Sequence, residues 1–125
     1  MKEFKLFRCH RCGNIIVKLA DSGVGVFCCG EQMTQIKPNT QDAATEKHVP
    51  VVEFKNKGVF VKVGEIAHPM LAEHYISHII LLTSGGAQIR ELSPNMLPQA
   101  EFVLQDDEKV LKAYSLCNLH GLWSN

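Results

Sequence analysis

Short apolar runs separated by polar turns make up most of the chain, and this pattern predicts strands rather than helices. Val, Ile, Phe and Tyr dominate the runs that follow Val49. Two polar, glycine-containing segments, residues 55–58 and 84–86, interrupt them as turns. Roughly seven short strands with such turns are typical of a β-sandwich. One helical turn is expected at residues 106–109, and strands are expected at residues 51–54, 59–63, 75–83, 88–92, 101–104 and 111–116.

The N-terminal part of the chain has a pattern of its own. Three short strands are expected at residues 4–8, 15–19 and 24–27, with turns between them. A piece below about 40 residues has too little interior to fold by burial alone, and a metal, disulfides or oligomerisation usually helps. Residues 37–47 are polar, so we interpret them as a linker. The expected architecture is therefore two all-β domains, residues 1–37 and 38–125.

Composition and charge narrow the classes of partner. The 125-residue chain is 46% hydrophobic, which is enough for a real core. Its 13 basic and 13 acidic residues leave a formal net charge of zero, which gives no indication of nucleic acid or an anionic membrane. Residues 1–6 lack the apolar core of a signal peptide, and the apolar run at residues 79–82 is too short to span a bilayer. We therefore expect a cytoplasmic protein.

Four of the five cysteines fall in the N-terminal part of the chain. Cys9-x-x-Cys12 is a chelating loop, and Cys28 and Cys29 stand side by side after fifteen intervening residues. In a reducing cytosol, grouped cysteines bind metal more often than they form disulfides. Four thiolates suit zinc or iron, so a structural zinc site remains open at this point. His10 lies inside the chelating loop and is expected to face solvent.

The fifth cysteine has a histidine partner. Cys117-x-x-His120 places a thiolate and an imidazole in one short loop, which indicates a second metal site of different chemistry. His48 precedes Val49-Pro50 and His68 precedes Pro69, so both are expected in extended or loop backbone. The alternative is a buried free cysteine beside unrelated histidines.

His74 and His78 have a spacing that would suit one metal ion on a helix. The residues around them predict a strand instead, on which positions i and i+4 are about 13 Å apart. At most one of these two histidines can therefore belong to the site.

These motifs together resemble a known family. Cys9-x-x-Cys12 followed by Cys28-Cys29 is similar to the desulforedoxin iron site. The other motifs resemble those of the two-iron superoxide reductases, the desulfoferrodoxins, in order and over essentially the whole chain. They are Glu46-Lys47-His48-Val49-Pro50, His68-Pro69-Met70, Glu73-His74 and Cys117-Asn118-Leu119-His120-Gly121.

The resemblance implies a small desulforedoxin-like metal-binding domain followed by an immunoglobulin-like β-sandwich. It implies two iron ions per chain and neither haem nor flavin. Cys9, Cys12, Cys28 and Cys29 would hold one iron. The other would take His48, His68, His74 and His120 around an equatorial plane, with Cys117 as axial ligand and the opposite face open. His78 departs from the family pattern, in which an aromatic residue is expected.

Counting charge gives the two irons different chemistry. Ferrous iron with four thiolates carries two net negative charges, whereas one thiolate and four neutral imidazoles leave it one positive charge. Superoxide is an anion and is therefore expected at the iron held by the histidines and Cys117. There it would be reduced to hydrogen peroxide without release of dioxygen. Lys47 would attract the anion, and Glu46 would cap the iron after turnover. The alternative for Lys47 and Glu46 is a solvated charge pair in the linker.

Two other functions remain open from the sequence. The chain could be an iron electron-transfer protein without catalytic turnover, or a zinc-stabilised binding module. The resemblance favours the superoxide reductase and implies a rubredoxin-like or other small electron donor. A homodimer is expected because the small N-terminal domain would gain burial from a second copy.

Overall fold

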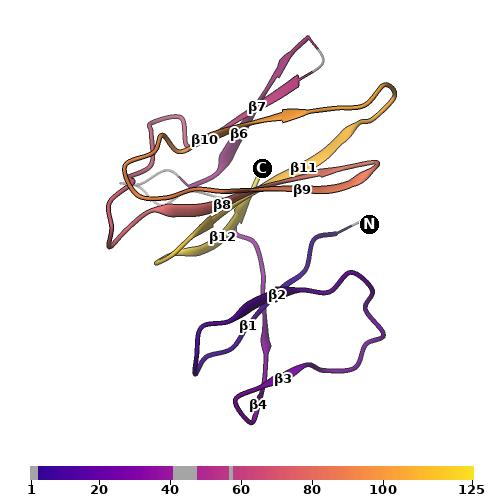
Figure 1. Cartoon of the computed structure of the whole chain (residues 1–125), viewed down its shortest axis with the longest axis vertical. Coiled ribbons are helices and arrows are strands. Elements are labelled where there is room, and N and C mark those ends of the chain that lie inside the picture. Colours follow the sequence, from indigo (N-terminus) through magenta and orange to yellow (C-terminus); the bar gives the residue numbers. More distant parts are fainter. Residues whose placement is uncertain (1–2, 41–47, 57) are drawn as a thin grey trace. The chain divides into compact units, whose positions relative to one another are not determined.

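The computed structural model describes residues 3–40, 48–56 and 58–125, and its regular elements there are strands without a helix (Figure 1). The prediction of an all-β protein is therefore confirmed. Within these ranges the chain has no helix long and apolar enough to cross a membrane. The chain divides into two compact units, Met1–Lys37 and Pro38–Asn125.

The N-terminal unit contains one three-stranded antiparallel sheet and one hairpin. Strand β1 (Leu6–Arg8) lies at the centre of the sheet, between β2 (Ile15–Val17) and β5 (Thr34–Ile36). The hairpin pairs β3 (Phe27–Cys28) with β4 (Glu31–Gln32). These strands have two or three residues each, so they supply few ladder hydrogen bonds.

The expected strand at residues 24–27 is wrong, because only Phe27 belongs to a strand. Residues 24–26 are irregular, and β4 and β5 follow where no strand was expected. Leu19, Val24 and Phe27 are all largely exposed, so this apolar stretch does not form the alternating buried face that its composition indicated. Few hydrophobic side chains are buried in this unit, and they are Phe4, Leu6, Cys9 and Met33.

Within its described residues, the second unit is a seven-stranded sandwich. One sheet has the order β10-β7-β6 and the other β12-β11-β8-β9, with every pairing antiparallel. Figure 1 shows the two sheets as separate layers. The strands are β6 (Pro50–Lys55), β7 (Gly58–Val63), β8 (Ile76–Thr83), β9 (Gly86–Glu91), β10 (Gln99–Val103), β11 (Val110–Cys117) and β12 (Gly121–Ser124).

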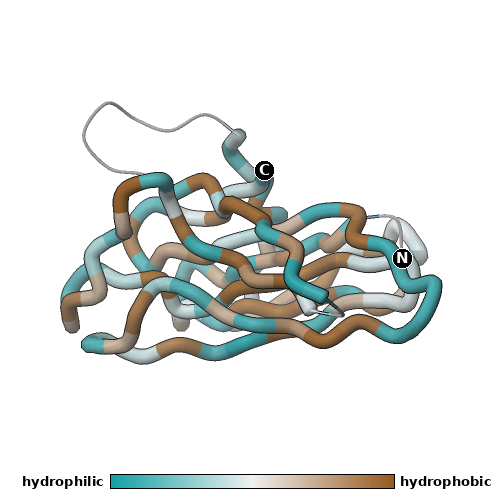
Figure 2. Tube along the Cα trace, turned by 90° about the horizontal axis from the view of Figure 1, so that it is seen from above, coloured by the Kyte–Doolittle hydropathy of each residue, from teal (hydrophilic) through white to brown (hydrophobic). Residues whose placement is uncertain are grey.

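The hydrophobic core lies between these two sheets. Val59, Val61 and Val63 alternate along β7, and each is at most 2% exposed. Ile79 and Leu81 of β8 meet them from the other sheet, in one cluster of buried residues. Figure 2 shows hydrophobic and hydrophilic residues alternating along the strands, as expected for sheets with one buried face. The sandwich expected from the sequence is therefore present.

Two details of the sandwich differ from expectation. The helical turn at residues 106–109 is wrong: Asp106 and Asp107 form a turn, and Asp107 has a φ of 67°, outside the helical region. Strand β12 was missed because it is short and begins with a glycine directly after His120. It is nevertheless central to packing, since Leu122 is fully buried and Trp123 is 7% exposed.

Candidate metal centres

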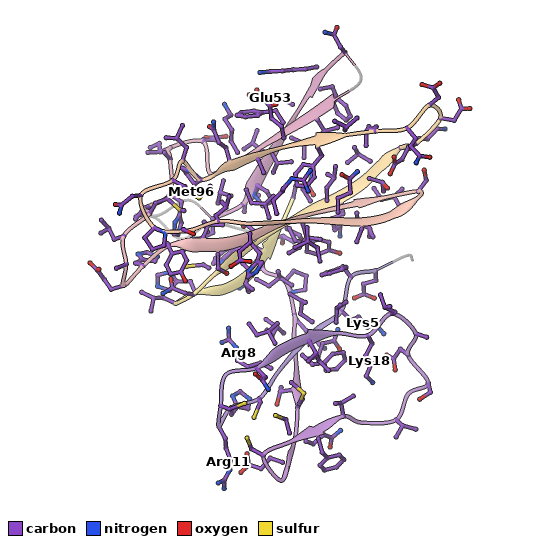
Figure 3. All side chains as sticks on the ribbon, in the orientation of Figure 1. Lys5, Arg8, Arg11, Lys18, Glu53 and Met96 are labelled. Atoms are coloured by element: carbon purple, nitrogen blue, oxygen red, sulfur yellow. The ribbon has the colours of Figure 1, made fainter. Side chains whose placement is uncertain are left out.

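Four cysteine side chains converge within the N-terminal unit. Their sulfur atoms all lie within 4.8 Å of one another, close enough for one metal ion to contact all four. Figure 3 shows sulfur atoms gathered near the labelled Arg11. Cys9 and Cys12 come from the loop between β1 and β2, and Cys28 and Cys29 come from the β3–β4 hairpin. The structure thus brings together the whole set that the sequence singled out.

The hairpin explains how two adjacent cysteines can face one point. Cys28 pairs with Glu31 across a two-residue turn formed by Cys29 and Gly30. Their φ angles are 53° and 76°, and positive values at both positions are typical of a type I′ turn. Cys28 therefore ends a strand while Cys29 has left-handed backbone. This difference leaves their sulfur atoms 4.0 Å apart.

When no cation is present, deprotonating more than one of these neighbouring thiols is unfavourable. Hydrogen bonding from the Cys12 backbone lowers the pKa of Cys9 to about 6. Hydrogen bonding with the Cys12 side chain raises the pKa of Cys29 to about 12 and also raises the pKa of Cys28. The Cys9 thiolate therefore forms readily, whereas ionisation of Cys28 and Cys29 is opposed. A bound cation would remove that opposition, because a metal binds the deprotonated thiols.

The cysteines are thiols rather than disulfides in this structure. The Sγ atoms of Cys12 and Cys28 are 3.6 Å apart, well beyond the roughly 2.05 Å of a disulfide bond. Asn14 lies beside them and donates from Nδ2 to Cys28 Sγ over 3.6 Å. His10 is exposed to solvent as expected, and its Nε2 lies 3.1 Å from Thr34 Oγ1.

A second group of ligand-type side chains lies at one end of the sandwich. Strand pairing places the start of β6 opposite the end of β7, through Pro50 and Val63. It also places the start of β8 opposite the end of β11, through Ile76 and Cys117. The segments just before or after these strand ends carry His48, His68, His74 and His120. Antiparallel topology therefore gathers residues that are far apart in the sequence.

The four imidazole rings form a closed quadrilateral. Going round it, the ring centroids are 4.6 Å apart for His48 and His68, 4.7 Å for His68 and His74, and 4.9 Å for His74 and His120. His120 and His48 close it at 4.9 Å, and the His48–His74 diagonal is 6.2 Å. Neighbouring rings are steeply inclined, at 64° to 89°. Such an arrangement surrounds one point with four imidazoles.

Cys117 completes the group from the buried side. Its Sγ lies 3.7 Å from His68 Nε2 and 4.0 Å from His120 Nδ1. The ligand atoms of His48, His74, Cys117 and His120 all lie within 4.8 Å of one another. Cys117 is fully buried and His120 is exposed, so the group extends from the core to the surface. A thiolate with several imidazoles is a donor set that suits iron, copper or zinc.

Neighbouring backbone and side-chain groups hold these histidines in place. The Pro69 carbonyl lies 2.7 Å from His68 Nδ1 and fixes the ring with Nε2 toward Cys117. Ser115 donates its hydroxyl to the His48 carbonyl over 2.6 Å. Trp123 stacks on the His48 ring and donates from Nε1 to the His120 carbonyl over 3.1 Å. Such partners commonly orient histidine ligands around a metal.

Sequence reasoning missed these supporting residues. Trp123 is the single tryptophan of the chain and follows His120 by three positions, which is the one signal that pointed to it. Ser115 stands within a continuous run of buried residues at the end of β11 and resembles any other core position. Lys47 and Glu46, by contrast, lie outside the described residues. His78 lies within β8 with Nδ1 2.9 Å from Ser77 Oγ, outside the group as the spacing predicted.

Comparison with known proteins finds one family along the whole chain. Residues 1–36 match the family model of the desulfoferrodoxin N-terminal domain, and residues 40–125 match the desulfoferrodoxin model. A desulfoferrodoxin of Syntrophotalea carbinolica is 44% identical over 99% of this chain and 97% of its own length. A superoxide reductase of Pyrococcus furiosus is 37% identical over 64% of this chain and 86% of its own.

Solved structures give the same result. The superoxide reductase of Treponema pallidum superimposes with a TM-score of 0.87 at 39% identity and covers 100% of this chain and 99% of its own. The one-iron superoxide reductase of Giardia intestinalis covers 65% of this chain and 96% of its own, with a TM-score of 0.57 and 35% identity.

Proposed function

The chain belongs to the desulfoferrodoxin family, and from this premise we propose that it is a superoxide reductase with two iron ions. The observation that carries the proposal is the closed ring of four imidazoles beside the buried Cys117 sulfur. The reaction takes one superoxide, one electron and two protons to hydrogen peroxide, with no dioxygen formed. Iron at this site would supply the electron by passing from the ferrous to the ferric state.

The proposed ligands of that iron are His48, His68, His74, His120 and Cys117. The buried thiolate needs a compensating cation, because an isolated buried charge is costly. The Pro69 carbonyl at His68 Nδ1 and the Trp123 ring stacked on His48 orient these two imidazoles. The exposed side at His120 offers an anion access from solvent.

Lys47 and Glu46 are proposed to act at the same site. Lys47 directly precedes His48 in the sequence, and its ammonium would raise the local concentration of superoxide. Its hydrogen bonds could also order a water that delivers a proton. Glu46 would cap the ferric site after turnover.

The four-cysteine centre is proposed to hold the second iron through Cys9, Cys12, Cys28 and Cys29. Four protein donors fill a tetrahedral site, so this iron can pass electrons or hold structure without binding superoxide. The small number of buried side chains in the N-terminal unit supports the structural part of that role.

We also propose a cytoplasmic homodimer that receives electrons from a rubredoxin-like or other small donor protein. Free grouped thiols suit a reducing compartment. Leu19 and Phe27 are 84% and 68% exposed, and a second copy would cover such apolar side chains.

An electron-transfer protein is the second candidate, because Cys12 and Cys29 are exposed and would let the four-cysteine iron exchange electrons at the surface. Mixing reduced, iron-loaded protein with superoxide in the absence of oxygen separates the two functions. The reductase requires rapid oxidation of the Cys117 iron with one hydrogen peroxide per superoxide consumed. Slow oxidation, or release of dioxygen, would contradict it.

A further inference from the structure

Asn118 links the loop that carries His74 to the end of β11, which carries Cys117. Its side-chain Nδ2 donates to the Glu73 carbonyl over 3.1 Å, and its Oδ1 accepts from the Tyr75 backbone N–H over 2.8 Å. The amide therefore bonds the peptide groups on both sides of His74. A third bond, from the Asn118 backbone N–H to the Tyr75 carbonyl, is 3.1 Å long.

This link stands where regular strand pairing fails. Strands β8 and β11 pair along most of their length, but their register shifts between Leu116 and Cys117. Beyond the shift only the Cys117–Ile76 pair and the backbone bond from Asn118 to the Tyr75 carbonyl continue the pairing, and neither reaches His74. His74 lies there, in a tight turn closed by two backbone hydrogen bonds with Leu71 of 2.9 and 3.1 Å. That turn secures itself, but it does not secure its distance from Cys117.

Only an amide of this length matches both partners. One bond needs a side-chain donor and the other needs an acceptor, and asparagine offers both on neighbouring atoms. Aspartate has a similar shape but would place a carboxylate oxygen against the Glu73 carbonyl. Alanine would remove both bonds.

We propose that Asn118 is a positioning residue that sets the place of His74 relative to Cys117. It acts through the backbone of residues 73–75 and contacts neither the metal nor superoxide. The inference rests on the proposed metal site of the reductase. It adds that the affinity and electronic properties of that site depend on a side chain outside the ligand set.

The test compares Asn118→Asp and Asn118→Ala with the unchanged full-length protein. Iron is titrated into metal-free protein, and iron at each centre is followed by its thiolate absorption band and its midpoint potential. We expect iron affinity at the Cys117 centre to fall about 10–100-fold in both variants, with a shifted band and potential. The four-cysteine centre should keep its wild-type values, which makes it an internal control.

Asn125→Ala is the matched control variant. Asn125 Oδ1 accepts from the Ala113 N–H on β11 over 2.9 Å, so its loss removes another asparagine side-chain bond to the backbone without touching residues 73–75. It should leave the Cys117 iron unchanged. If Asn118 served stability alone, substitutions at Asn118 and at Asn125 would both lower the unfolding temperature. Neither would shift the absorption band or the midpoint potential of the Cys117 iron, and the proposal would be overturned.

Wild-type iron affinity, band and potential in both Asn118 variants would also overturn it. Should Asn118→Ala fail to fold, Asn118→Asp still decides, because it retains the acceptor for Tyr75. The readout is independent of turnover. An iron-binding protein that failed to reduce superoxide would reject the proposed function while leaving the role of Asn118 measurable.

Discussion

Trp123 stacks on His48 with ring centroids 4.5 Å apart and planes inclined by only 14°. The same indole donates from Nε1 to the carbonyl of His120, so one side chain contacts two of the proposed ligands. Because His48 and His120 are 72 positions apart, Trp123 ties together chain segments that the strands alone do not connect at this point. The indole also provides an optical probe within contact distance of the site.

Loading the Cys117 centre with iron should quench the fluorescence of Trp123. It is the only tryptophan, and it stacks on a proposed ligand of this centre. Visible-absorbing iron a few ångströms beyond the stacked imidazole provides an efficient route for energy loss. Emission is measured while iron is titrated into metal-free protein, with the Cys117→Ser variant as control. Unchanged emission during loading of the wild-type centre would contradict the proposed ligation by His48.

Replacing Ser115 by alanine should destabilise the sandwich by about 1–3 kcal/mol, because it leaves the buried carbonyl of His48 without its hydroxyl donor. Ser115 is fully buried, which limits replacement of that bond by solvent. Urea unfolding of metal-free protein measures the change. Exposed Ser93→Ala serves as control and should fall within about 0.5 kcal/mol of wild type. Equal effects of the two substitutions would show that the His48 contact is unimportant.

Glu108 should stabilise the sandwich in a pH-dependent way. The Thr83 hydroxyl and the Gln105 backbone N–H donate to its carboxylate and lower its pKa below the ordinary 4.5. A lowered folded-state pKa contributes stability above the unfolded value, and that contribution disappears as pH falls through the folded value. Glu108→Ala should therefore lower the unfolding temperature at pH 7. The difference from wild type should narrow as pH drops below 4.5, and a constant difference would argue against ionisation as the cause.

Lys47→Ala should slow the reaction with superoxide on the order of tenfold at low ionic strength, because it removes a steering charge. The rate of the variant should also depend less on salt, since screening acts on that attraction. Pulse radiolysis at several salt concentrations measures both. Lys57→Ala removes another lysine beyond the described residues and serves as control. The same rate and salt slope in Lys47→Ala and wild type would remove Lys47 from the mechanism.

Removing metal should unfold the N-terminal unit and spare the sandwich. Residues 1–37 bury few side chains, whereas the sandwich has a continuous core between its sheets. Amide hydrogen exchange with and without a strong chelator measures this. Protection should be lost at Leu6–Arg8 and Thr34–Ile36 but kept through Ile76–Thr83. Retained protection in β1 would show that the unit folds without its metal.

The sequence was most informative where chemistry requires particular residue types. The cysteine pairs, the Cys117-x-x-His120 chelate and the exclusion of His78 all follow from spacing and strand geometry, and the structure places these side chains accordingly. The all-β character followed from repeated β-branched and aromatic runs interrupted by turns.

The sequence was least informative where tertiary contacts determine whether a segment forms a strand or supports the site. The strand expected at residues 24–27 failed because those side chains find no core to pack against. Strand β12 was missed because four residues give too little periodicity, although it pairs with β11 and residue 39 and three of its four residues are buried. The role of Asn118 depends on a register shift between two strands, which no local pattern reports.

The four histidines of the proposed iron site are widely separated along the chain, and this has a consequence for biosynthesis. Contacts between residues 72 positions apart form only after a large loop has closed, which makes this part of the sandwich intrinsically slow to fold. A nascent or partly folded chain therefore holds incomplete ligand sets that bind iron weakly. Redox-active iron would be retained at the Cys117 centre only after the last loops have docked, so the topology delays metal capture at that centre until the polypeptide is mature.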